Sequence, residues 1–401
     1  MSIKSYLTNL RQQLKSKSLN SPLTVVTGNQ SADMDSVVSA LTFAYFSNLH
    51  SKQYIIPLIN IPRRDLKLRR DIVTLLDYYS ITEDLLFFVE DFQNIVKESD
   101  QILINLVDHN NIQGDELHEA FGAGKLKVVG IIDHHEDEGQ FVESQPRIIR
   151  TCGSNSSLVF NYFYNEFFKS NTSKFLETQL EAIKLLLGPL LIDTSGMTQK
   201  VEEPDTEAFS IYQKALEGDE KFIQLFANSG DKDPYTNYYS TLKAAKKDVS
   251  GFKFVDLLRK DYKQFTFDNG DRVGFSSVTK AFKWIVANYS KEEIEKTLIK
   301  TLEENNIDLL IIGTHFTRKD NDKYTREFGY YYKKLENEKF NNLHNLAETK
   351  LQLNNEVYGA DKIVSTVETL SSHGNFKVFN QGNISASRKQ VVPIVKEILE
   401  N

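Results

Sequence analysis

The 401-residue chain has little cysteine and no long hydrophobic run, and both absences narrow what it can be. Its one cysteine, Cys152, excludes a disulfide framework and suits a reducing compartment. No segment approaches the roughly 18 apolar residues that a membrane-spanning helix needs. Residues 1–19 have the pattern of an amphipathic helix and lack the apolar core of a secretory signal. We therefore expect a cytoplasmic protein that does not engage a membrane.

An excess of positive charge is also missing. The net charge of −7 argues against a protein that binds nucleic acid over its whole surface, although it leaves room for a local basic groove. The sequence has no internal repeat and no low-complexity segment. Because 401 residues is long for a single core, we expect two domains.

The first 200 residues have the alternating pattern of an α/β domain. A polar loop containing Gly28 separates the first predicted strand from a helix over 36–48, which is the opening of a βαβ unit. A helix from about Leu158 and a long helix over 175–192 follow later in the chain. This pattern predicts a mostly parallel sheet flanked by helices. Its predicted strands are residues 23–27, 54–59, 86–89, 102–107, the run into Asp133, and an edge strand over 147–151.

The last 150 residues predict a smaller C-terminal α/β domain. Polar, lysine-rich helices fill residues 202–250 before it. We place the first domain at 1–240, a linker at 241–251 and the second domain at 252–401, with the active site in a cleft between the domains. In the second domain the predicted strands are 273–278, 307–312, 328–332 and 376–379, and the predicted helices are 280–303, 337–350 and 389–400.

The segment VVGIIDHHED, residues 128–137, carries the clearest chemical signal. Its apolar run reads as a strand buried on both faces, and it ends abruptly in Asp133, His134 and His135. Ligands of open α/β sheets gather at the carboxyl ends of such strands. Taken alone, such a His pair is more often a satisfied surface pair than a functional one.

Four further carboxylates follow apolar segments in the same way. They are Asp33 and Asp35 in GNQSADMDS, Asp108 after INLV, and Asp193 after LLLGPLLI. Carboxylates with imidazole suit Mg²⁺, Mn²⁺ or Co²⁺, and this much negative charge is enough for two divalent cations. Two such cations favour in-line displacement at phosphorus. A single aspartate of this kind could be a cap or turn residue, and the spacing alone does not show that the loops converge.

In order, GNQSADMDS, LVDHN, GIIDHH and LLIDTS resemble the four motifs of the DHH phosphoesterase family. The glycine-rich C-terminal motif of the RecJ-type nucleases is absent. Instead, KDYKQF and SRKQVVP resemble the C-terminal domain of family II inorganic pyrophosphatases, cytosolic exopolyphosphatases and prune-type proteins. Length and several longer stretches are most similar to the fungal cytosolic exopolyphosphatases. The pyrophosphatases begin their first motif with a metal-binding His where this chain has Asn29.

The resemblance implies a role for each matching position. Asp35, Asp108, His134 and Asp193 would hold one divalent cation. Asp33 and the bridging Asp108 would hold the other, with Asn29 as a weak ligand or a neighbour of one. Asp108, His134 and His135 would be the catalytic set. The residues expected to contact the phosphate chain are His135, Asn155, Lys263, Ser387, Arg388 and Lys389.

These roles imply an exopolyphosphatase that uses two divalent cations, Mg²⁺, Mn²⁺ or Co²⁺. Water activated by the cations would attack the terminal phosphorus of inorganic polyphosphate and release orthophosphate. Arg63 and Arg64 are candidates for a basic groove, although they could also pair locally with Asp65 and Asp71. The alternatives are a pyrophosphatase, a prune-like nucleotide phosphodiesterase, or a non-catalytic polyanion-binding protein. We expect a monomer that binds no nucleic acid and whose domains close on the substrate.

Overall fold

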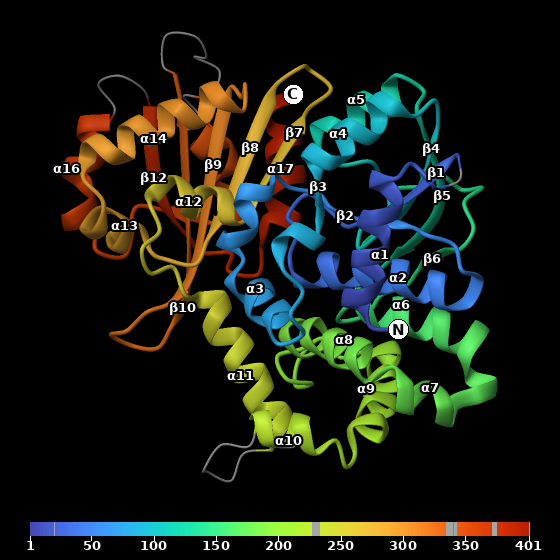
Figure 1. The fold of residues 1–401 in the computed structure, drawn as a ribbon. Coiled ribbons are helices and arrows are strands. Elements are labelled where there is room, and N and C mark those ends of the chain that lie inside the picture. The colour runs from blue at the N-terminus through green and yellow to red at the C-terminus, as the bar shows by residue number, and fades with distance from the viewer. Residues whose placement is uncertain (20, 227–232, 334–339, 341–342, 371–374, 401) are drawn as a thin grey trace. The chain divides into compact units, whose positions relative to one another are not determined.

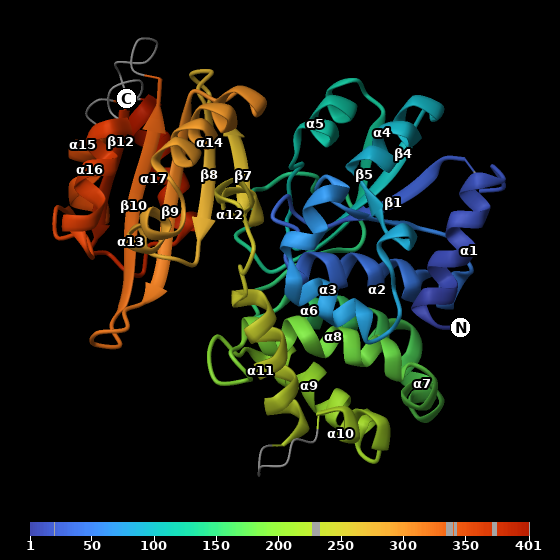
Figure 2. The same ribbon diagram turned by 60° about the vertical axis from the view of Figure 1, so that its left-hand side comes forward.

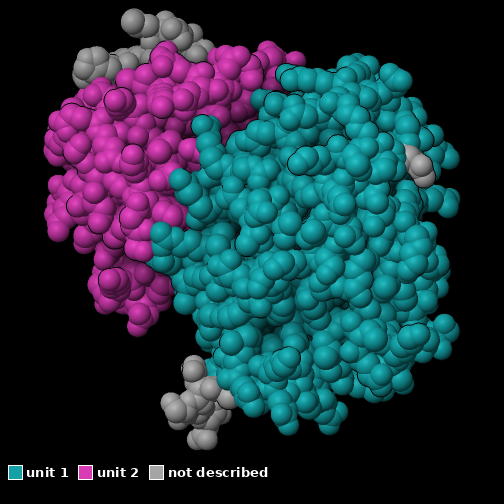
Figure 3. Space-filling view, in the orientation of Figure 1, with its two compact units in different colours: residues 1–248 teal, residues 249–401 magenta. Residues whose placement is uncertain are grey.

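The structure is a computed structural model that describes residues 1–19, 21–226, 233–333, 340, 343–370 and 375–400 (Figure 1). The chain divides into two compact units, Met1–Asp248 and Val249–Asn401, coloured teal and magenta in Figure 3. Each unit has its own six-stranded sheet. The division falls just after helix α11 (Pro234–Lys247), so most of the residues predicted as a linker belong to a helix.

Unit 1 is built on a fully parallel sheet, as the sequence pattern predicted. The strand order is β3-β2-β1-β4-β5-β6, and every neighbouring pair runs parallel. Figure 2 shows α4 and α5 on one side of this sheet and α2, α6 and α8 on the other. The strands are β1 (Leu23–Thr27), β2 (Ile56–Ile59), β3 (Phe87–Phe88), β4 (Ile102–Val107), β5 (Leu126–Asp133) and β6 (Arg147–Ile149).

The helices of unit 1 cover both faces of the sheet, so its strands read as continuous apolar runs. The central helix α2 is itself almost entirely buried. The helices are α1 (Ile3–Lys15), α2 (Met34–Ser51), α3 (Arg70–Asp77), α4 (Val89–Glu98), α5 (Asp115–Gly122), α6 (Asn155–Phe163), α7 (Thr172–Thr178), α8 (Leu180–Asp193), α9 (Glu203–Leu216), α10 (Glu220–Phe226) and α11. Among the described residues, none of the helices is both long and apolar enough to cross a membrane.

Unit 2 has a mixed sheet in the order β11-β12-β10-β9-β8-β7, and Figure 2 labels the strands from β12 to β7 across it. Among the described strands of unit 2, only β8 and β9 pair in parallel; the other neighbours are antiparallel. Its strands are β7 (Tyr262–Thr266), β8 (Arg272–Val278), β9 (Leu309–Thr317), β10 (Tyr324–Tyr332), β11 (Leu353–Asn354) and β12 (Asn375–Gln381). Its helices are α12 (Phe254–Lys260), α13 (Phe282–Asn288), α14 (Lys291–Glu304), α15 (Leu343–Leu351), α16 (Ala360–Leu370) and α17 (Arg388–Glu400).

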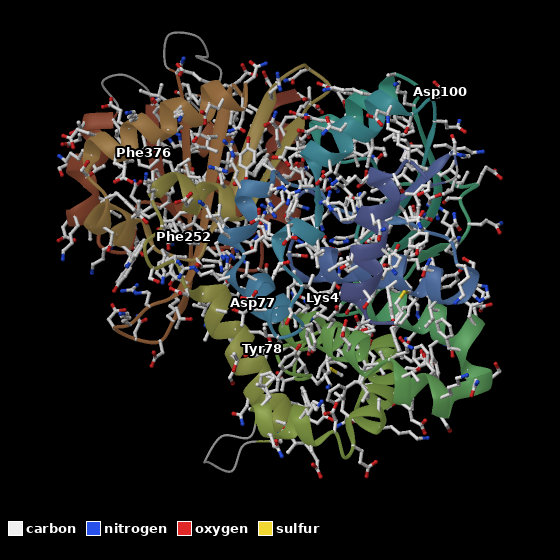
Figure 4. The ribbon with its side chains drawn as sticks, in the orientation of Figure 1. Lys4, Asp77, Tyr78, Asp100, Phe252 and Phe376 are labelled. Atoms are coloured by element: carbon white, nitrogen blue, oxygen red, sulfur yellow. The ribbon has the colours of Figure 1, made fainter. Side chains whose placement is uncertain are left out.

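Two separate apolar layers hold the sheet of unit 2. Leu310 and Ile312 face one layer, formed with α12, α13, α14 and α16, whereas Leu309 and Ile311 face the other, formed with α15 and α17. This alternation is the period of a strand covered on both faces. Phe376, labelled in Figure 4, lies in the first layer, where its ring packs edge-on against Phe282 at 5.9 Å.

Candidate active site

Three neighbouring strands of unit 1 deliver the predicted site residues to one edge of the sheet. Strands β1, β4 and β5 lie side by side and run parallel, so their carboxyl ends meet at the same edge. The loop after β1 contains Asn29, β4 is followed by Asp108, and β5 ends at Asp133, just before the two histidines. The sheet therefore brings together segments that are separate in the sequence.

Asp108 lies at the centre of this group and is 2% exposed. Its backbone has a φ of 61°, a left-handed conformation that is uncommon outside glycine and that concentrates at functional sites. One carboxylate oxygen, Oδ2, accepts hydrogen bonds from Ser36 Oγ at 2.6 Å and from Asn29 Nδ2 at 2.7 Å. The other, Oδ1, lies 3.2 Å from His134 Nε2 and 3.7 Å from His135 Nδ1. Asp108 thus faces both histidines.

Asp35 stands in the first turn of α2 and is held by the N-terminus of α6. Its Oδ1 accepts from Ser154 Oγ and from the Ser156 amide, both at 2.8 Å, and its Oδ2 accepts from the Asn155 amide at 2.6 Å. A helix N-terminus stabilises a carboxylate because its free N–H groups and dipole favour negative charge. Oδ2 also lies 4.0 Å from His134 Nε2, so Asp35 joins the same group.

The ring orientation of each histidine is fixed by a neighbour. Nδ1 of His134 lies 3.0 Å from the Cys152 carbonyl oxygen, which makes Nδ1 the donor and leaves Nε2 turned toward Asp108 and Asp35. Nδ1 of His135 lies 2.7 Å from Oδ1 of the fully buried Asp133. A histidine held in this way by a carbonyl or a carboxylate is the usual arrangement of a metal-binding imidazole.

The crowded carboxylates of this site favour a bound cation. Burial and the neighbouring Asp108 raise the pKa of Asp35 well above its usual range, and burial with Asp33 and Asp108 raises the pKa of Asp193 to about 7 despite Lys246. Burial alone would lower the pKa of His134, but its hydrogen bond with Asp108 raises it to about 12. Carboxylates crowded in this way repel one another unless positive charge is present.

Oxygen and imidazole donors therefore fit a hard or borderline divalent cation. Ligand atoms of Asp108, His134 and His135 all lie within 4.8 Å of one another. Asp33 and Asp193 act electrostatically on Asp35, which places them in the same neighbourhood. Asp33 is exposed and also caps α2, accepting from the Ser36 amide at 3.0 Å, and Asp193 is the last residue of α8.

Hydrogen bonds within the site fix the positions of two predicted residues. Asn29 points its amide nitrogen at Asp108, while its oxygen accepts from the Ser31 amide at 2.9 Å, so it lies beside Asp108 as a neighbour of that predicted ligand. Asn155 is 0% exposed. The backbone amide of Asn155 donates to Asp35, so Asn155 lies behind that carboxylate. We had expected Asn155 to face the phosphate chain.

The predicted substrate residues of the C-terminal half all lie in unit 2. Ser387 and Arg388 line a small pocket together with Ser277, Gly313, Arg326 and Gln381. The Arg388 guanidinium is already paired with Asp261, 2.6 Å from Oδ1. Lys389 is exposed at the start of α17, and Lys263 lies on the edge strand β7. Arg326 was not foreseen, because its strand was predicted to begin only at Phe328.

Three of the four arginines in residues 61–71 (IPRRDLKLRRD) differ in their surroundings. Arg63 pairs with Asp91 at 2.9 Å and lies over the Phe88 ring, which is local pairing with a partner other than the ones we considered. Arg64 is exposed. Arg69 is 4% exposed and donates to the carbonyls of Ser31 and Ala32, at 2.5–3.0 Å and 2.9 Å. It holds the loop that carries Asp33, a role that no sequence pattern indicated.

Comparisons with known proteins identify the family to which the chain belongs. Residues 23–188 match the DHH family, N-terminal domain, and residues 240–398 match the DHHA2 domain. The chain is 33% identical over 413 residues to the "Putative exopolyphosphatase" of Schizosaccharomyces pombe, with 99% of this chain and 98% of the relative covered. It is 26% identical over 403 residues to human "Exopolyphosphatase PRUNE1", covering 99% of this chain and 79% of the relative. The chain therefore belongs to the DHH family.

A pyrophosphatase relative is more distant. The "Manganese-dependent inorganic pyrophosphatase" of Methanocaldococcus jannaschii is 23% identical over 288 residues, covering 71% of this chain and 80% of the relative. The crystal structure of a Methanococcus jannaschii "putative family II inorganic pyrophosphatase" superposes with a TM-score of 0.56 at 21% identity, covering 94% of this chain and 100% of that one. At this identity the superposition confirms the predicted α/β fold.

Proposed function

We propose that this chain is an exopolyphosphatase that removes the terminal phosphate of inorganic polyphosphate as orthophosphate. The observation that carries the proposal is the convergence of Asp35, Asp108, His134 and His135 at the ends of three parallel strands. The S. pombe relative, which aligns with nearly the whole chain, bears the name of such an enzyme and supports this choice of substrate.

The donor set supports two divalent cations, Mg²⁺, Mn²⁺ or Co²⁺. Asp35, Asp108, His134 and Asp193 would hold one of them, and Asp33 with Asp108 would hold the other. Asn29 would keep Asp108 in place through its 2.7 Å hydrogen bond. Bound divalent cations lower the pKa of water and neutralise charge on phosphoryl oxygens. The name of the M. jannaschii relative, a manganese-dependent enzyme, is consistent with this requirement.

The chain's own groups would orient the phosphate and balance its charge. His135, held by Asp133 at 2.7 Å, would direct its other ring nitrogen to a phosphoryl oxygen. Lys263, Arg388 and Lys389 of unit 2 would hold the remaining phosphates of the chain, with Ser387 and Arg326 in the same pocket as Arg388. In-line transfer depends on such positioning and charge stabilisation more than on covalent chemistry.

The experiment is an orthophosphate-release assay on long-chain polyphosphate, tripolyphosphate, pyrophosphate and a cyclic nucleotide, each with Mg²⁺, Mn²⁺ or Co²⁺. We expect rapid release from polyphosphate and little from the others. An inorganic pyrophosphatase is the second candidate, supported by the fold match, and a preference for pyrophosphate would select it. Absence of metal-dependent release from every substrate would contradict an enzymatic role.

Asp108→Asn tests the central carboxylate in the same assay. The amide keeps the shape but loses the charge that faces both histidines. We expect kcat to fall by more than about 100-fold, because residues that only orient a metal ligand already contribute about 10–100-fold. Asp77→Asn is the control, because Asp77 is an exposed carboxylate at the end of α3, labelled in Figure 4. Equal activity of both variants would remove Asp108 from the mechanism.

A further inference from the structure

Asp205 is a fully buried carboxylate that the proposed chemistry does not use. It stands in the first turn of α9 and is 0% exposed. Its Oδ2 accepts from the Gly153 amide at 2.6 Å and from the Glu202 amide at 3.0 Å. Its Oδ1 accepts from the Ser154 amide at 3.2 Å and from Ser157 Oγ at 2.8 Å. Three of these four donors belong to one short segment, residues 153–157.

The same segment holds Asp35 on its other side. Ser154 Oγ, the Asn155 amide and the Ser156 amide donate to Asp35 at 2.6–2.8 Å. Residues 153–157 therefore lie between two buried carboxylates, one of the candidate metal site and one outside it. Each carboxylate uses N–H groups that the start of α6 leaves free.

The segment has little room to adjust. A Cβ atom on Gly153 would lie 2.6 Å from Thr194 Cγ2, 2.6 Å from the Lys200 carbonyl oxygen and 3.1 Å from Asp205 Oδ2. The backbone is thus pressed between Asp205 and the residue that follows Asp193. A shift of this segment would be passed directly to the donors of Asp35.

We propose that Asp205 is a positioning residue of the metal site. By fixing residues 153–157, it keeps three donors on Asp35 and leaves Asp35 Oδ2 directed at His134 Nε2, 4.0 Å away. The inference rests on the proposed metal site and adds a residue to it that touches neither metal nor substrate. Residues that orient a metal ligand in this way commonly contribute 10–100-fold to metal affinity.

Helix capping alone accounts for only part of this geometry. Asp205 and Glu202 form the capping box of α9, which explains the bond from the Glu202 amide. The bonds to Gly153, Ser154 and Ser157 bridge about 50 residues of chain and do nothing for that cap. Any test must therefore separate the effect of Asp205 on the capping of α9 from its effect on the position of residues 153–157.

Three substitutions make this separation. Asp205→Asn places an NH₂ group against N–H or O–H donors in either orientation of the amide, because both oxygens accept from such groups. Ser157→Ala removes one bond to the segment and leaves the capping box of α9 intact. Asp91→Asn is the matched control, since Asp91 occupies the same capping-box position in α4, where it accepts from the Phe88 amide at 2.9 Å.

The readouts are the Mn²⁺ dissociation constant by titration calorimetry and urea unfolding without metal. We expect Asp205→Asn to weaken Mn²⁺ binding by about 10–100-fold and Ser157→Ala by a smaller factor, whereas Asp91→Asn lowers stability alone. If Asp205→Asn and Ser157→Ala lower stability but leave the dissociation constant at the wild-type value, Asp205 is only a cap and the inference is wrong.

Asp35→Asn distinguishes this failure from failure of the proposed site. Loss of Mn²⁺ affinity in Asp35→Asn with wild-type affinity in Asp205→Asn and Ser157→Ala would overturn the positioning role and keep the site. If the wild-type protein binds no Mn²⁺, the proposed metal site and the positioning role both fall.

Discussion

Glu327 is a carboxyl group buried in the middle of β10, in unit 2. It is 0% exposed, and its Oε2 accepts from the Phe282 amide at 2.8 Å and from Thr314 Oγ1 at 3.0 Å. Burial raises its pKa from 4.5 to about 7, although these hydrogen bonds act in the opposite direction. The folded protein therefore keeps this proton at pH values where the unfolded chain has released it.

Because the pKa of Glu327 is raised in the folded state, its contribution to stability is complete below about pH 4.5 and is lost as the pH rises through about 7. Glu327→Gln keeps an oxygen for Phe282 and Thr314 and carries no charge. We expect its free energy of unfolding, relative to wild type, to increase by about 3 kcal/mol across this interval. Urea titrations followed by the fluorescence of Trp284, the single tryptophan and a residue of unit 2, measure this difference. If the difference in unfolding free energy between Glu327→Gln and wild type does not change with pH, the raised pKa of Glu327 is contradicted.

At the residue scale, the sequence indicates which side chains can bind a metal, but it does not indicate which hydrogen bonds orient those side chains. Asp35, Asp108 and His134 were predictable because each follows a strand or opens a helix beside one. Arg69 and Asp205 carry no such signal, since they bond to backbone groups far along the chain. Asn29 shows the same limit, because the direction of its amide depends on Asp108, 79 residues away.

At the scale of elements, the approach of α2 to β1 depends on Gly28. A Cβ at this position would lie 2.5 Å from Ser36 Cβ and 2.8 Å from the Ser36 carbonyl oxygen, a backbone atom that cannot turn aside. Gly28→Ala would push α2 away from the strand and would carry Ser36 away from Asp108, its partner at 2.6 Å.

We expect Gly28→Ala to lower the free energy of unfolding by about 1–3 kcal/mol, the usual cost of overpacking, and also to weaken Mn²⁺ binding. Gly122→Ala is the matched control, because a Cβ there would meet nothing within 4 Å and its backbone is helical. Urea unfolding and calorimetry on both variants check the prediction. Equal stability of the two variants would mean that the strand and the helix separate without cost.

Periodicity predicted most elements and failed where tertiary contacts interrupt them. Strands 23–27 and 102–107 were predicted to the residue. The helix predicted over 175–192 breaks at Gln179, whose side chain accepts from the Tyr45 hydroxyl at 2.7 Å. The helix predicted over 280–303 divides between α13 and α14, where Ser290 caps a new start. Strand β7 was missed because its half-buried, polar residues lack alternation. Within 337–350, residues 337–339 and 341–342 lie outside the described residues.

At the scale of the whole molecule, the described residues form one hydrophobic core in unit 1 and two apolar layers in unit 2, and charge is distributed unevenly between the units. Acidic residues outnumber basic ones in residues 1–248, whereas basic residues slightly outnumber acidic ones in residues 249–401. The acidic unit contains the candidate metal ligands, and the basic unit contains the residues proposed to hold a polyanion. The length of the chain predicted two domains, but this division of charge could be seen only with the boundary after Asp248.

A metal that binds only unit 1 should stabilise only that unit. Ligand present at 100 times its dissociation constant adds about 2.7 kcal/mol to the state that binds it. The apolar core of unit 1 is separate from the two layers of unit 2. We therefore expect Mn²⁺ to raise the urea concentration at which unit 1 unfolds and to leave that of unit 2 unchanged. Trp284 fluorescence follows unit 2 alone, whereas far-ultraviolet circular dichroism follows both units. We therefore expect Mn²⁺ to shift the dichroism curve and not the fluorescence curve, and Asp35→Asn to abolish the shift. An equal shift of both signals would show that the units unfold as one cooperative body, in which metal binding at one sheet stabilises the other.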